Sequence, residues 1–133
     1  MNKSILQEKS FAFAIRIVNM YRYMCDEKKE FVLSKQILRS GTSIGANVRE
    51  AKRGQTNPDF YSKLTIALKE ADETAYWLEL LNQTGYLDND MYESMHKDCE
   101  ELIKILVSIT KTLKNKESTK KDSEIRTPNS ELS

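Results

Sequence analysis

Apolar residues recur every three or four positions along most of the chain, which is the spacing of an amphipathic α-helix. On the first stripe lie Leu6, Phe13, Ile17, Met20 and Met24. This stripe predicts a helix over about residues 4–25. The polar run DEKKE at residues 26–30 then interrupts the pattern, and a second apolar series predicts a helix that ends near Arg53. The members of that series are Leu33, Ile37, Ile44, Val48 and Ala51.

Two further helices follow, each with a start signal in the sequence. Because proline is well tolerated in the first turn of a helix, we expect Asn57 to cap a third helix whose first residue is Pro58. Its apolar series is Phe60, Leu64, Ala67, Ala71, Thr74, Leu78 and Leu81. We expect Gly85 to end this helix and Asp88 to cap a fourth one, which ends near residue 114. The fourth series is Met91, Met95, Cys99, Leu102, Leu106, Ile109 and Leu113.

Four such helices joined by short loops predict an all-α protein, an antiparallel up-down-up-down four-helix bundle over residues 1–114. Residues 115–133 are rich in Lys, Ser and Glu and poor in apolar side chains, so we expect a disordered polar tail. Within the bundle, Gly41 and Gly45 form a G-x-x-x-G step on the second helix. We expect this step to pack closely against a row of small residues on the third helix, namely Ala67, Ala71 and Ala75.

Composition agrees with one all-α domain, since 133 residues contain only 4 Gly and 2 Pro. No apolar run approaches the roughly 20 residues that cross a bilayer, and the N-terminal residues do not resemble a signal peptide. We therefore expect a cytoplasmic protein that does not enter membranes. Cys25 and Cys99 are isolated thiols, which we expect to act as small buried hydrophobic residues rather than as a disulfide.

Two stretches of the chain carry a family resemblance. They are SKQILRSGTSIGANVREAKRG at residues 34–54 and NPDFYSKLTIALKEADETAYWLELL at residues 57–81, with TGYL shortly after. They resemble the bacterial four helix bundle protein family, also called 23S rRNA intervening sequence proteins, over about residues 5–113. In the commoner form of the motif the position of Gly45 is Pro and that of Ala51 is Gly.

The resemblance implies an antiparallel bundle that assembles with copies of itself into a ring, a homopentamer. A related group of proteins serves as accessory subunits of diversity-generating retroelements. Those proteins bind a reverse transcriptase and nucleic acid through basic surfaces. The implied partners are therefore further copies of the chain, RNA or DNA, and a nucleic-acid enzyme.

Charge is unevenly distributed, although the formal net charge is only +1. Residues 28–53 hold seven Lys or Arg against two Glu, whereas residues 59–81 hold two Lys against five acids. On a helical projection, Lys35, Arg39, Arg49 and Arg53 fall within an arc of about 80°, with Lys52 to one side. This face predicts contacts with nucleic-acid phosphates. The alternatives are a solvated face, or a contact between subunits with the acidic helices.

The helices also have more apolar surface than one bundle core requires. A second stripe beside the core stripe of the first helix includes Phe11, Val18 and Tyr21, and the outer face of the third helix carries Ile66, Tyr76, Trp77 and Leu80. Aromatic residues are enriched in protein interfaces, so we predict that these seven residues form an oligomer interface. Partial cover by loops and the tail is the alternative.

The polar residues of the motif, Ser43, Asn47 and Glu50, lie between the basic arc and the apolar seam, and we expect them to make structural hydrogen bonds to neighbouring helices or to an Arg such as Arg39. The E-x-x-H step of Glu93 and His96 resembles half of a di-iron site, but the chain has a single His. We therefore expect no catalytic residues, metal or cofactor. The sequence favours a non-enzymatic, self-associating protein that binds nucleic acid or a nucleoprotein partner; the alternative is a protein-protein adaptor without a nucleic-acid role.

Overall fold

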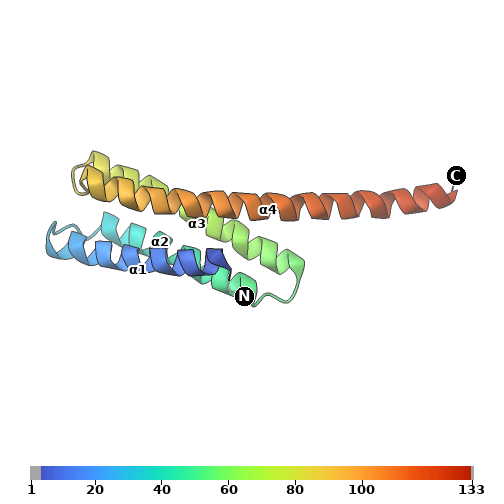
Figure 1. The fold of residues 1–133 in the computed structure, drawn as a ribbon, viewed down its shortest axis with the longest axis horizontal. Helices are drawn as coiled ribbons and strands as arrows, with labels where there is room; N and C mark the ends of the chain where they lie inside the picture. Colours follow the sequence, from blue (N-terminus) through green and yellow to red (C-terminus); the bar gives the residue numbers. More distant parts are fainter. Residues whose placement is uncertain (1–3, 133) are drawn as a thin grey trace.

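The computed structural model describes the backbone of residues 4–132 and the side chains of residues 4–119. Its four helices are α1 (Ile5–Asp26), α2 (Leu33–Lys52), α3 (Asn57–Gln83) and α4 (Asn89–Leu132). Consecutive helices run antiparallel and lie side by side, as Figure 1 shows. The part of the chain that the structure describes contains no strand. The prediction of an all-α up-down-up-down bundle is confirmed.

One apolar core runs along the bundle, and each helix contributes the stripe that the sequence predicts. The fully buried members with the largest side chains include Phe13, Ile17, Met24, Ile37, Ile44, Leu64, Leu78, Leu81, Leu87, Leu102 and Leu106. Burying one such side chain stabilises a fold by about 1.5–3 kcal/mol. The predicted positions near the ends of the stripes, including Leu33, Phe60, Met91 and Leu113, are only partly buried.

The start of α3 corrects one expectation. Thr56 is the N-cap residue, and its side-chain oxygen accepts a hydrogen bond from the backbone N–H of Asp59 at 3.1 Å. Asn57 is already the first helical residue, beside Pro58. The shift has a simple reason, because Thr56 adopts the extended backbone that an N-cap requires.

The end of α3 is a Schellman motif around Gly85, whose φ of +85° is in the left-handed region. The N–H of Tyr86 bonds the carbonyl of Leu81 at 3.0 Å, and the N–H of Gly85 bonds that of Asn82 at 3.1 Å. Asp88 then caps α4 through the N–H of Met91 at 2.8 Å. The predictions for Gly85 and Asp88 are both confirmed.

The glycine step of α2 faces α1, so the expected packing against the alanine row of α3 is wrong. A Cβ atom on Gly41 would lie 2.7 Å from the side chain of Ile17, and one on Gly45 would lie 3.2 Å from the backbone oxygen of Ser10. Helices α2 and α3 nevertheless pack together, and their buried contacts include a hydroxyl pair in which Thr74 donates to Ser40 at 2.9 Å.

Ion pairs join α1 to α4 along the edge of the bundle. Arg16 pairs with Asp98 at 2.6 Å, and its second terminal nitrogen donates to the hydroxyl of Ser94 at 2.9 Å. Lys9 pairs with Glu101 at 3.0 Å. All four charged side chains of these pairs are at least 40% exposed, so each pair contributes at most about 1 kcal/mol.

Helix α4 continues to Leu132, so the expected helix end near residue 114 is wrong. No Gly or Pro occurs between residues 115 and 127, and the Lys and Glu residues there have good helix propensity, so no local signal stops the helix. In Figure 1 this part of α4 projects beyond the other three helices. The division into a bundle and a disordered tail of residues 115–133 stays a prediction, and side chains from residue 120 lie outside the described residues.

Glu30 closes the start of α2 in a way that the sequence did not reveal. Its carboxylate accepts hydrogen bonds from the backbone N–H groups of Val32, Leu33 and Ser34 at 3.1, 2.9 and 2.7 Å. The hydroxyl of Ser34 donates to the Glu30 carbonyl at 2.8 Å. Burial opposes ionisation of Glu30, but these donors outweigh it and lower the pKa of the carboxyl below its usual 4.5.

We expect Glu30→Gln to lower the free energy of unfolding at pH 7 by about 0.5–2 kcal/mol, as loss of a helix cap does. Because folding lowers the pKa, the ionised carboxylate stabilises the fold above its unfolded pKa, and this contribution is lost as the pH falls through the folded pKa. Urea unfolding of both proteins at pH 7 and about pH 3 should show the gap closing in acid. The exposed Glu27→Gln is the control; an equal gap at both pH values contradicts the assignment.

We expect Gly41→Leu to destabilise the bundle by about 1–3 kcal/mol, because the added side chain must displace the fully buried Ile17. Thermal or denaturant unfolding measures the change. Ala12→Leu places the same side chain at an exposed position of α1 and should change stability by less than about 0.5 kcal/mol. Equal stability of the two variants would show that α1 and α2 are not in close contact at Gly41.

Candidate nucleic-acid interface

The five basic residues predicted to bind nucleic acid, namely Lys35, Arg39, Arg49, Lys52 and Arg53, all lie at the surface. Four of them belong to α2 and Arg53 is its C-cap residue, and the opposite face of α2 enters the core through Ile37, Ile44 and Val48. The local reason is helix periodicity, since the basic residues and the buried ones occupy different arcs of one helix. The structure therefore places all five where a ligand can approach.

Arg39 is nevertheless already neutralised within the chain. Its guanidinium donates to Glu70 of α3 at 3.1 Å and also forms a short contact with Glu73 of α3. The Glu73 carboxylate, together with Glu70, raises the pKa of Arg39. Glu73 also accepts the indole N–H of Trp77 at 3.0 Å, and this bond and Arg39 lower the pKa of Glu73. Arg39 thus contacts an acidic helix of its own chain, which differs from the contact between subunits that the sequence left as an alternative.

The remaining basic residues differ in their surroundings. No ion pair among the side chains of residues 4–119 involves Lys35, Arg49 or Arg53. Arg49 lies over the ring of Phe11, with its guanidinium carbon 5.7 Å from the ring centroid. Lys52 already interacts with another group of the protein. The cations that stay available to a ligand are therefore Lys35, Arg49 and Arg53.

Of the three polar residues of the motif, two form hydrogen bonds within their own helix and one forms an ion pair with a neighbouring helix. Ser43 donates to the carbonyl of Arg39 at 2.6 Å, and Asn47 donates to the carbonyl of Ser43 at 2.8 Å, both within α2. Glu50 does reach a neighbouring helix, where it pairs with Lys63 of α3 at 2.7 Å. The partners of Asn47 and Glu50 are thus Ser43 and Lys63 rather than Arg39, which pairs with α3.

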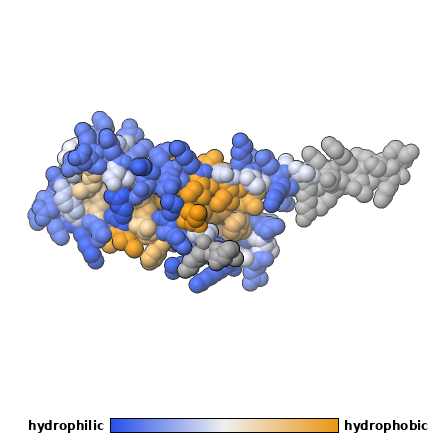
Figure 2. Space-filling model, viewed as in Figure 1, coloured by the Kyte–Doolittle hydropathy of each residue, from blue (hydrophilic) through white to orange (hydrophobic). Residues whose placement is uncertain are grey.

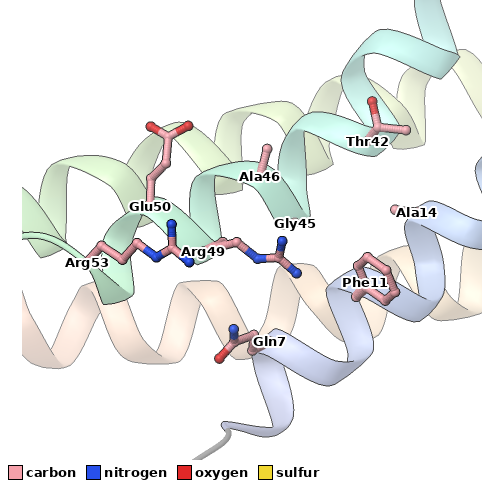
Figure 3. A pocket seen from close by; sticks show the side chains of 9 residues that line it. All are labelled: Gln7, Phe11, Ala14, Thr42, Gly45, Ala46, Arg49, Glu50 and Arg53. Carbon is pink, nitrogen blue, oxygen red and sulfur yellow. The ribbon is translucent and has the colours of Figure 1, made fainter.

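A cleft of about 350 Å³ lies between α1 and α2, next to the basic residues. It is lined by Gln7, Phe11 and Ala14 of α1, by Thr42, Gly45, Ala46, Arg49 and Glu50 of α2, and by Arg53, the C-cap residue of α2. Figure 3 shows the guanidinium of Arg49 reaching from α2 toward Phe11, with Arg53 beside it, whereas Glu50 points away from the cleft. Sequence periodicity put Phe11 with the apolar surface residues and gave no sign of its contact with Arg49.

The residues predicted to form an oligomer interface lie at or near the surface. Tyr76, Phe11 and Ile66 are 57%, 55% and 38% exposed. Val18, Tyr21, Trp77 and Leu80 are half-buried. Trp77 packs against the core and meets the edge of the Tyr76 ring, with the centroids 5.1 Å apart. Trp77 thus contributes to the monomer fold as well as to the surface.

Further exposed apolar residues escaped the sequence reasoning, including Ile5, Ile15, Phe31, Val32 and Val107. Figure 2 shows apolar side chains gathered in the middle of the face on which α1 and α4 lie in Figure 1. The five residues named above lie outside the regular apolar stripes, so helical periodicity does not predict them as an apolar surface.

The groups that could carry chemistry are dispersed. Among the described residues, no group of three or more His, Cys, Asp or Glu side chains could hold a metal ion. His96 lies 3.6 Å from Glu100 and 5.2 Å from the Tyr92 ring centroid. Cys99 is buried, its thiol donates to the carbonyl of Ala71 at 3.3 Å, and burial raises its pKa to about 12. Such a thiol stays protonated and unreactive at neutral pH.

Fold and surface together define a helical-bundle protein with a partly neutralised basic helix, and the described helices include none long and apolar enough to span a membrane. The family model of the 23S rRNA-intervening sequence protein matches residues 2–108. The chain belongs to this family.

Solved structures agree with this assignment. The chain is 58% identical to a protein of unknown function from the S23 ribosomal protein family of Bacteroides thetaiotaomicron, whose crystal structure it matches with a TM-score of 0.80. The match covers 80% of this chain and 99% of that protein. No curated protein matches the chain. Neither this family nor this neighbour of unknown function indicates an enzymatic activity.

Proposed function

We propose that this protein is a non-enzymatic, homo-oligomeric bundle that binds RNA or DNA through the outer face of α2. The observation that carries the proposal is the set of three surface cations, Lys35, Arg49 and Arg53, that no described carboxylate neutralises. A ligand with closely spaced phosphates would pair with them, and it would release its bound counterions on doing so. We place this activity in the cytoplasm.

Self-association follows from the exposed apolar residues on two different helices. The residues that support it are the half-buried Val18 and Tyr21 on α1 and the exposed Ile66 and Tyr76 on α3, whereas Phe11, predicted with them, lies at the cleft beside Arg49. Contacts between two different patches are heterologous, and such contacts form a ring when the rotation from one subunit to the next closes. We propose a ring of five chains, which would repeat the basic face of α2 around the assembly and raise the affinity for one long strand through multivalency.

If phosphate contacts drive binding, affinity for RNA will fall steeply as salt rises. Three contacts per chain predict a slope of roughly −2 in a plot of log K against log salt for a single strand. Reversing Lys35, Arg49 and Arg53 to Glu should abolish binding, as measured by fluorescence anisotropy with labelled RNA and DNA.

The matched control reverses Lys97, Lys104 and Lys111, which are exposed residues of α4, and so makes the same change in net charge. It should retain most of the affinity. Equal losses in the two triple variants would indicate a general charge effect, and no binding by the wild type at low salt would rule out the proposal.

Light scattering during gel filtration tests the assembly. The wild type should elute with about five times the chain mass of 15.4 kDa, and Ile66→Glu with Tyr76→Glu should shift it toward the monomer. The pair Ser62→Glu and Gln83→Glu, at exposed positions of α3, is the control and should leave the mass unchanged. A monomeric wild type would contradict the ring.

The competing function is a protein-protein adaptor, including one for a nucleic-acid enzyme. The observation in its favour is that Arg39 is already bound to Glu70 and Glu73, which removes one cation from the basic face. Crosslinking in cells, with identification of both RNA and protein, separates the two functions. Recovery of protein partners without nucleic acid would favour the adaptor.

A further inference from the structure

The cleft between α1 and α2 combines an exposed aromatic ring with cationic groups. Phe11 forms one wall and is 55% exposed although it belongs to a packed helix. Next to it lie Ala14, Gly45 and Ala46, whose short or absent side chains leave room beside the ring. The surface beside Phe11 is therefore open to a second flat ring.

The charged side chains that point toward this cleft are cationic. Arg49 and Arg53 reach along the same side of α2, and the guanidinium of Arg49 lies 5.7 Å from the centroid of the Phe11 ring. The one carboxylate in the lining, Glu50, points away in Figure 3 and is paired with Lys63 of α3 at 2.7 Å. An anionic ligand in the cleft thus meets two guanidinium groups and no free carboxylate among the lining residues.

We propose that this cleft binds one unpaired nucleotide of a single-stranded nucleic acid, with its base against the ring of Phe11 and its phosphate between Arg49 and Arg53. This inference rests on the proposed nucleic-acid binding and specifies its substrate class. Aromatic rings and guanidinium planes both stack on unpaired bases. In a duplex the faces of the bases are covered by their neighbours, so the cleft selects single strands.

The test replaces the aromatic ring and leaves the charges in place. We expect Phe11→Ala to weaken binding of a ten-nucleotide uridine strand by about 5- to 150-fold, the range for loss of one stacked base. Phe11→Trp should restore binding, and its added indole fluorescence should be quenched by the strand. Because Phe11 is exposed, Phe11→Ala should fold normally.

Three controls make the result specific. Binding of a blunt duplex and of inorganic polyphosphate, which offer no unpaired base, should be the same for wild type and Phe11→Ala. Ile15→Ala removes another exposed apolar residue of α1 and should leave strand binding unchanged. A parallel titration with a ten-nucleotide deoxyuridine strand, which differs only in the sugar, identifies which sugar is bound more tightly; stacking on either strand supports the proposal.

The outcomes separate this inference from the proposed function. If Phe11→Ala binds the strand as the wild type does, while reversal of Lys35, Arg49 and Arg53 abolishes binding, the nucleotide site is wrong and the basic face stands. If Phe11→Ala changes the oligomeric mass, Phe11 belongs to a subunit contact, which also overturns the site. If the wild type binds no strand at low salt, both proposals fail.

Discussion

The close approach of α1 and α2 at two glycines determines which side chains of these two helices meet at the surface. At Gly41 the side chain of Ile17 occupies the space of a Cβ atom, and at Gly45 the backbone of Ser10 does nearly the same. A larger side chain at Gly41 would have to displace Ile17, and one at Gly45 would require the backbone of Ser10 to shift slightly. The approach brings Phe11 of α1 beside Arg49 of α2, and so creates the cleft between them.

A second set of contacts, between α2 and α3, decides which charges stay available. Arg39 is held by Glu70 and Glu73, and Glu73 is itself held by Trp77. This network turns one member of the basic arc into a structural residue, since its charge is compensated by α3. The proposed binding of phosphates by the α2 face therefore rests on Lys35, Arg49 and Arg53.

Family membership establishes the fold of the chain, whereas its surface chemistry bears on function. Membership in the 23S rRNA-intervening sequence family, and the match to a structure of unknown function, establish the fold and the lineage of the chain. Function must be argued from sites, because one fold carries many activities. Here the sites are a cationic helix face, a cleft with an exposed ring, and apolar residues on α1 and α3 that one chain leaves uncovered.

The sequence by itself determined the four helices and the buried stripe of each, because periodicity along a helix is a local property that burial follows. It also revealed the turn at Gly85 and the cap at Asp88, whose signals lie within a few residues. Local signals missed Glu30, because a carboxylate that caps the next helix looks like any polar loop residue. Tertiary structure alone decided that the glycines face α1, that Arg39 binds α3, and that Phe11 meets Arg49. These contacts join different helices, and the sequence pattern of one helix contains no information about the rotation of its neighbour.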